Sequence, residues 1–182
     1  MIRGSLARRY ARALMAIGQD KGIYRELGDE LKQLSRLAGE DATFRLVITA
    51  PIINKEARDK VIEALAPALG LNEVMVRFLK LLNKKGRLPF LEQISMAYEE
   101  MVDEALGRVR AEVVSARPLS EEAGAKIRAA LADFTGKEVL MQIEVDDTLI
   151  GGVTARVAGK LLDGSVKTQL KAVEERLKAA GA

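Results

Sequence analysis

The chain has 182 residues, of which 48% are hydrophobic and 30% charged, a composition typical of a folded, helix-rich protein with one large or two small domains. It contains no Cys and no His, which excludes disulfides, thiolate zinc sites, Cys nucleophiles and His general bases. Its net charge of +3 is a small difference between 29 basic and 26 acidic residues, which disfavours a dedicated nucleic-acid binder.

Residues 1–106 have the pattern of six successive amphipathic helices joined by short connections. In each helix, apolar residues recur three or four positions apart, which places them on one face. The helices are expected at residues 5–22, 23–38, 41–48, 54–69, 72–86 and 88–106. Pro67 is expected to end or kink the fourth of them. The sequence therefore predicts a compact six-helix bundle over residues 1–106.

The first helix is apolar over more of its surface than one core stripe requires. One expected face consists of Leu6, Tyr10, Ala13, Leu14 and Ile17. The small residues Ala7, Ala11 and Ala13 further interrupt its charged surface. Either the bundle buries this helix on two sides, or part of it forms a groove that receives a partner helix. The pattern alone leaves both explanations open.

From residue 107 onward the apolar period changes from helical spacing towards alternation. Strands are expected at 108–116, 137–145 and 148–157, and helices at 118–134 and 165–181. The predicted fold class is therefore mainly α with a small α+β part, in which a β-α-β-β-α domain over 107–182 follows the bundle. Gly151 and Gly152 fall inside the expected third strand, where paired glycines indicate a bulge or a close backbone approach.

The stretch DDTLIGGVTARVAGKLLDGSV, residues 146–166, contains glycines followed by a lysine, as a phosphate-binding loop does. The spacing does not fit, because Gly152 and Gly159 lie seven positions apart where such a loop has five. Leu161 also follows Lys160, at the position where a magnesium-binding hydroxyl is required. A structural role for these glycines is favoured, and a nucleotide-dependent enzyme is disfavoured.

The first helix carries four arginines, Arg3, Arg8, Arg9 and Arg12. A helical module that binds nucleic acid, or an anionic membrane surface, through this helix is an alternative function. No aromatic or Gly-rich stretch accompanies the arginines to stack on bases, so a solvated helix face is the simpler explanation.

Three stretches, read together, resemble a known family: LARRYARALMAIGQDKG, NKKGRLPFLEQISMAYEEMVDEALGRVRAEVVSARPLS and DDTLIGGVTARVAGKLLDGSVKTQL. In this order they resemble the delta subunit of bacterial F-type ATP synthase, which is similar to the mitochondrial oligomycin-sensitivity-conferring protein. The structural signature of the family falls on Gly151, Gly152, Asp163, Gly164 and Ser165. One departure is Ala158-Gly159-Lys160, where the family often has Gly-Asp, and it affects only a hairpin turn.

The resemblance implies a non-catalytic peripheral-stalk (stator) subunit without cofactor or metal, present once per complex and binding no nucleic acid. It implies that 1–106 bind the N-terminal helix of a head alpha subunit and that 107–182 bind the C-terminal ends of the b subunits. The implied head-binding residues are Ala7, Tyr10, Ala11, Leu14, Val76, Leu79, Lys80 and Asn83. The protein is expected at the cytoplasmic face of the bacterial inner membrane, attached only through the complex, because the basic N-terminus has no transit-peptide pattern.

Overall fold

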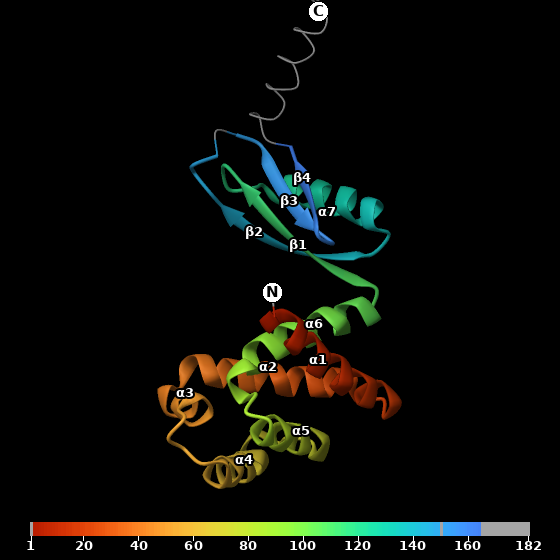
Figure 1. Cartoon of the computed structure of the whole chain (residues 1–182). Helices are drawn as coiled ribbons and strands as arrows, with labels where there is room; N and C mark the ends of the chain where they lie inside the picture. Colours follow the sequence, from red (N-terminus) through yellow and green to blue (C-terminus); the bar gives the residue numbers. More distant parts are fainter. Residues whose placement is uncertain (1, 150, 165–182) are drawn as a thin grey trace, which may run out of the picture. The chain divides into compact units, whose positions relative to one another are not determined.

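The structure, a computed structural model, describes residues 2–149 and 151–164. It divides between Val102 and Asp103 into two compact units, one helical and one containing a sheet (Figure 1). The predicted class, mainly α with a small part that contains strands, is confirmed. The division lies slightly before residue 107, where the change of period placed the boundary, because the last turn of the sixth helix belongs with the second unit.

The first unit consists of consecutive helices with short connections. Their bounds are α1 (Ile2–Asp20), α2 (Tyr24–Glu40), α3 (Ala42–Thr49), α4 (Lys55–Leu69), α5 (Glu73–Lys84), the 3-10 turn η1 (Leu88–Phe90) and α6 (Leu91–Ala105). The side chains of Asp41, Asn54 and Asn72 cap the starts of α3, α4 and α5 by accepting backbone N–H bonds. Pro67 does not end α4, which continues to Leu69, because a proline so near the C-terminus interrupts few helical hydrogen bonds.

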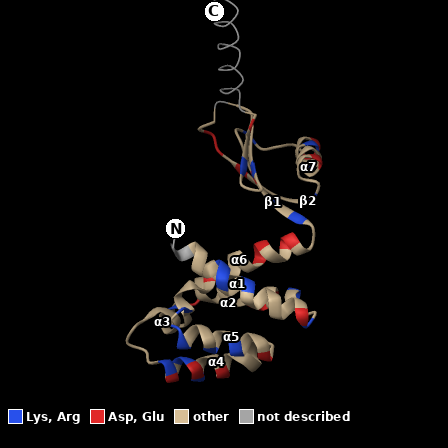
Figure 2. Ribbon diagram, turned by 45° about the vertical axis from the view of Figure 1, so that its right-hand side comes forward, with Lys and Arg blue, Asp and Glu red and all other residues tan. Residues whose placement is uncertain are grey.

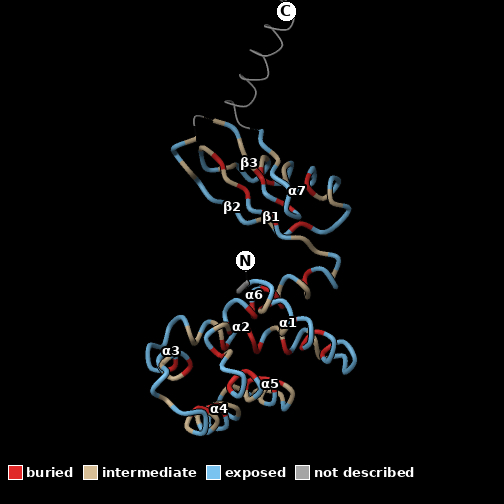
Figure 3. Tube along the Cα trace, in the orientation of Figure 1, coloured by how far each residue is buried: buried red, intermediate tan, exposed pale blue. Residues whose placement is uncertain are grey.

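The core of the first unit lies where the inward stripes of these helices meet, and Figure 3 shows the buried segments on the facing sides of the helices. Its largest fully buried side chains are Leu14, Leu27, Leu31, Leu34, Met75, Leu82, Leu88, Leu91, Ile94 and Tyr98. Burying a side chain of this size stabilises a fold by about 1.5–3 kcal/mol, so these residues supply most of the driving force that holds the helices together.

Glu30 and Tyr98 place polar groups within this apolar core. Glu30 of α2 accepts a hydrogen bond from the backbone N–H of Asn72, at 2.9 Å, and so joins α2 to the start of α5. The hydroxyl of Tyr98 donates to the carbonyl of Tyr24. Burial raises the pKa of Tyr98 to about 12, with a further contribution from the nearby charge of Glu30. Burial also raises the pKa of Glu30, and the neighbouring carboxylate of Glu26 adds to this shift.

Replacement of Glu30 by Gln is expected to remove one pH dependence of the stability of the fold. The folded state holds the Glu30 proton more tightly than the unfolded state, so the fold loses stability as pH rises from 4.5 through the raised pKa. Glu30→Gln keeps an acceptor for Asn72 and cannot ionise. Its free energy of unfolding in urea should exceed that of the wild type at pH 7.5, and the difference should shrink by pH 4. Equal pH profiles for the two proteins would contradict this.

The second unit packs one helix on a four-stranded sheet. Its elements are β1 (Arg108–Ser115), α7 (Glu121–Thr135), β2 (Glu138–Val145), β3 (Val153–Val157) and β4 (Lys160–Asp163). The strand order is β2-β1-β3-β4, with β1 and β2 parallel and the other pairs antiparallel. The parallel pair requires a crossover, which α7 supplies. Alternate residues of the strands, including Val113 and Val139, face Leu131 of α7 in a separate small core.

Two details of this sheet differ from the predicted β-α-β-β arrangement. A fourth strand, β4, begins at Lys160, which the sequence placed in a turn. The turn instead consists of Ala158 and Gly159, whose φ angles are 51° and 75°, the pair of positive values that a tight two-residue hairpin requires. Gly151 and Gly152 lie before β3 rather than inside it. The helix expected at 165–181 lies outside the described residues.

Candidate partner-binding site

The small residues Ala7 and Ala11 of α1 face the core of the first unit. Ala7, Ala11 and Leu14 are only 2%, 0% and 1% exposed, and all three belong to the core. They recur three or four residues apart, so they form one stripe along the helix. These three predicted binding residues therefore pack the fold together and offer no open surface to a partner.

A second apolar stripe of α1 lies beside the first and remains partly open. It consists of Leu6, Tyr10, Ala13 and Ile17, spaced three or four residues apart. Ile17 is 44% exposed, Ala13 is also exposed, and Leu6 and Tyr10 are half-buried. Both explanations left open by the sequence thus apply to α1, because one stripe is buried in the bundle and the next is available.

The ring of Tyr10 marks where α1 meets α5. It lies 6.5 Å from the ring of Phe78, centre to centre, with the planes at 67° in an edge-to-face arrangement. Val74 and Leu81 lie four residues before and three residues after Phe78, so they continue the same side of α5. Leu81 is 43% exposed and Val74 is half-buried. We call the combined surface of Leu6, Tyr10, Ala13, Ile17, Val74, Phe78 and Leu81 the α1–α5 strip.

The predicted residues of α5 lie elsewhere. Leu79 is buried in the core. Lys80 and Asn83 contact α4, on the side of α5 away from Tyr10, and Val76 lies one turn from them on that side. The predicted residues of α5 therefore lie in its core stripe and on its α4 side, because helical spacing identifies stripes but not the neighbouring helix that each stripe faces.

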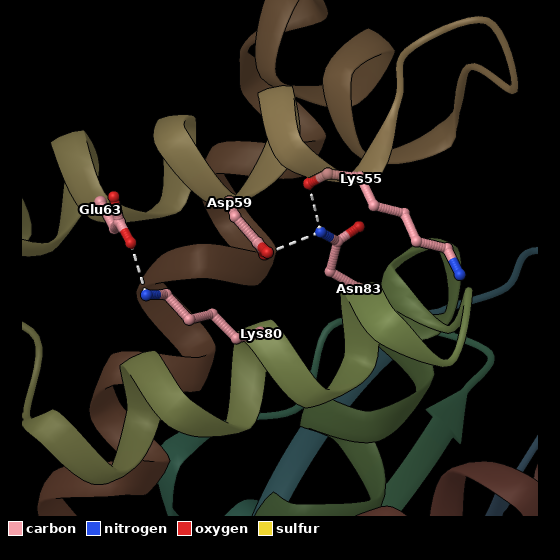
Figure 4. Close-up of polar contacts among 5 residues, drawn as sticks. All are labelled: Lys55, Asp59, Glu63, Lys80 and Asn83. Carbon is pink, nitrogen blue, oxygen red and sulfur yellow. Dashed lines mark hydrogen bonds and ion pairs between the residues drawn. The ribbon is translucent and has the colours of Figure 1, made fainter.

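Asn83 acts as a clamp between α4 and α5 (Figure 4). Its side-chain Nδ2 donates to the backbone carbonyl of Lys55, at 2.7 Å, and to the carboxylate of Asp59, at 2.8 Å. The side chain of Lys55 in turn donates to the carbonyl of Lys84, at 2.9 Å. Asn83 is only 1% exposed. It therefore satisfies polar groups at the start of α4 and fixes the end of α5 beside them.

Lys80 forms an ion pair with Glu63 of α4, one helical turn away from the clamp (Figure 4). The two side chains are 2.5 Å apart and both are substantially exposed. Their hydrogen bond raises the pKa of Lys80 and lowers the pKa of Glu63. Exposed pairs of this kind contribute little to stability, typically less than about 1 kcal/mol.

The signature residues of the second unit have backbone roles. Gly152 has a φ of 88°, which favours glycine, and its carbonyl accepts a hydrogen bond from Ala116. At Gly164 a Cβ would lie 3.2 Å from the carbonyl oxygen of Val153, the atom to which the Gly164 N–H donates. Gly151 precedes β3 and Asp163 is the last residue of β4, whereas Ser165 lies outside the described residues. This local geometry supports the structural role that the spacing favoured.

Within residues 2–149 and 151–164, no three carboxylates gather as they would to hold a metal ion. No helix in that part of the chain has both the length and the apolar character needed to cross a membrane. The candidate site is therefore the α1–α5 strip, a surface whose chemistry fits the binding of an apolar helix face.

Comparisons with known proteins agree with each other. The family model for the ATP synthase delta (OSCP) subunit matches residues 6–177. The ATP synthase subunit delta of Desulfosudis oleivorans is 41% identical over 173 residues, covering 95% of this chain and 94% of that protein. The subunit delta of Geotalea uraniireducens is 36% identical over 177 residues, covering 97% and 98% of the two chains.

The fold has a solved counterpart. A chain in the cryo-EM structure of the Toxoplasma gondii mitochondrial ATP synthase hexamer matches with a TM-score of 0.74 and 23% identity, covering 94% of this chain and 97% of that chain. The match of the family model over nearly the whole chain, together with the two bacterial relatives, establishes the family. The chain belongs to the ATP synthase delta (OSCP) subunit family.

Proposed function

We propose that this chain ties the catalytic head of ATP synthase to its peripheral stalk through two separate surfaces, one on each compact unit. As an ATP synthase delta subunit it is a non-catalytic stator subunit that supports proton-driven ATP synthesis. The comparisons give no support to a nucleic-acid-binding module. The observation that carries the proposal is the partly exposed α1–α5 strip in a chain of this family.

The first unit binds the N-terminal helix of a head alpha subunit along the α1–α5 strip. An amphipathic helix presents apolar side chains every three or four residues, a spacing that matches that of the apolar residues along α1 and along α5 in the strip. Tyr10 and Phe78 form its floor, and Ile17 and Leu81 are open enough to be covered. Ala7, Ala11 and Leu14 support this surface from beneath rather than touching the partner.

The second unit binds the C-terminal ends of the b subunits. The edge strand β2 exposes Ile143 and Val145 on the sheet face that carries α7, and Leu140 on the opposite face. Neighbouring β1 buries Val113, which is paired with Ile143, so the cover supplied by α7 ends at this edge. The exposed pair of Ile143 and Val145 at a sheet edge is suited to a partner that covers it. One copy of the chain serves each complex, at the cytoplasmic face of the bacterial cell membrane.

Removal of the chain from the complex is expected to release the head. When membranes from a deletion strain are sedimented, most ATPase activity should remain in the supernatant, and the membranes should lose ATP-driven proton pumping. Restoring the intact chain should return both, whereas restoring residues 1–102 alone should return neither, because the stalk surface is missing. Head ATPase that stays bound and proton-coupled without the chain would refute the stator role.

A further inference from the structure

The outward face of α1 is an open surface that the bundle does not use. It is lined by Ser5, Arg8, Arg9, Arg12, Ala13 and Ala16, with the basic side chains spaced along the helix between small ones. Figure 2 shows a patch of basic residues on α1. Apart from Ala13, this surface is distinct from the α1–α5 strip.

The positive charge of this face is largely unbalanced. Within α1 the only acidic residue is Asp20, at the C-terminal end. Arg8 pairs with Glu100 of α6, at 3.3 Å. In the described part of the chain, Arg9 and Arg12 have no acidic partner, although Arg9 lies over the ring of Tyr10. Like charges three and four residues apart repel one another, so this arrangement costs the isolated helix stability.

We propose that this face binds an acidic helix of another ATP synthase subunit, as a second contact beside the α1–α5 strip. Ser5 and Ala16 are small enough for a helix backbone to approach closely, and the arginines lie where carboxylates of such a helix would meet them. The contact relieves the repulsion between Arg9 and Arg12, which lie three residues apart. The inference requires only that the chain assembles into the complex. The face adjoins the α1–α5 strip at Ala13 and at Arg9, which lies over the ring of Tyr10.

Charge reversal tests the proposal in the assembled enzyme. ATP synthase complexes depleted of this chain are titrated with wild-type protein, with Arg9→Glu/Arg12→Glu and with a control, Lys32→Glu/Arg36→Glu. The control pair is exposed on α2 at the same kind of spacing and changes the net charge equally. We expect about a tenfold or greater loss of affinity for the α1 variant at low salt, little loss for the control, and a smaller difference at high salt.

Equal affinities for the two variants, with unchanged circular dichroism, would overturn the proposal. The proposal would also be overturned if the isolated wild-type chain bound phosphatidylglycerol vesicles or a DNA duplex, and the α1 variant lost this binding but still bound the complex normally. An independent variant, Leu81→Glu in the α1–α5 strip, separates the two surfaces. If Leu81→Glu binds like the wild type but the α1 variant binds weakly, only the proposed role of the α1–α5 strip is refuted. If the wild-type protein does not bind the depleted complex, the proposed function itself is refuted.

The absence of cysteine allows a direct location of the partner. Ala16→Cys, labelled with a photoreactive group, should cross-link in the assembled complex to a subunit segment rich in Asp and Glu. Lys32→Cys, labelled in the same way, should not cross-link to that segment. A cross-link to a basic or apolar segment, or none at all, would contradict an acidic helix at this face.

Discussion

Leu81→Glu is expected to weaken the binding of this chain to a catalytic head that lacks it by about 100-fold, without unfolding the first unit. Leu81 is 43% exposed, so about half of its side chain remains to be covered by a partner. The substitution removes that gain, about 1 kcal/mol, and places a carboxylate in an apolar contact, which costs about 1–3 kcal/mol more. Each 1.4 kcal/mol corresponds to roughly a tenfold change in affinity.

The measurement is a titration of head complexes with labelled full-length protein. Met96→Glu is the matched control, because Met96 is 61% exposed on α6 and lies outside the α1–α5 strip. Its affinity should stay within about threefold of the wild-type value. If both variants bind like wild type while their urea unfolding curves are unchanged, the α1–α5 strip does not bind the head.

The helices of the first unit could be predicted because each carries a clear periodic stripe. Three of them, α3, α4 and α5, also begin at a capping side chain. The excess apolar surface of α1 was also visible in the sequence. Which of its stripes is open depends on the helices packed around it, and a single sequence does not supply this information. Ala11, a residue the resemblance implied for binding, is consequently fully buried.

In the second unit, the prediction of strands from the sequence was limited by their length. Its strands β1 and β2 alternate over eight residues each, and their period is easily recognised. The strand β4 has only four residues, Lys160–Asp163, too few to establish a period. Its existence depends on the turn at Ala158, a residue that rarely adopts a positive φ. Propensity alone therefore gave no reason to place a hairpin there, and the turn was expected only from the family resemblance.

Asn83 and Lys80 both came from the same implied set of binding residues, and the structure gives them different roles. Asn83→Leu should lower the free energy of unfolding by about 2–4 kcal/mol, because it leaves the carbonyl of Lys55 and the carboxylate of Asp59 without their buried donor. Lys80→Ala should lower it by less than about 1 kcal/mol, because the pair with Glu63 is exposed. Urea denaturation of the full chain, followed by circular dichroism, measures both.

A second substitution distinguishes the loss of the hydrogen bonds of Asn83 from a change in the volume of its side chain. Asn83→Asp keeps the size of the side chain but removes its donors and places a carboxylate beside that of Asp59, so its loss of stability should equal or exceed that of Asn83→Leu. The loss should shrink at low pH, where protonation relieves the repulsion. Below the temperature at which it unfolds, Asn83→Leu should still bind the head, because Asn83 faces α4. A fully folded Asn83→Leu protein with greatly weakened head binding would instead make Asn83 a direct contact.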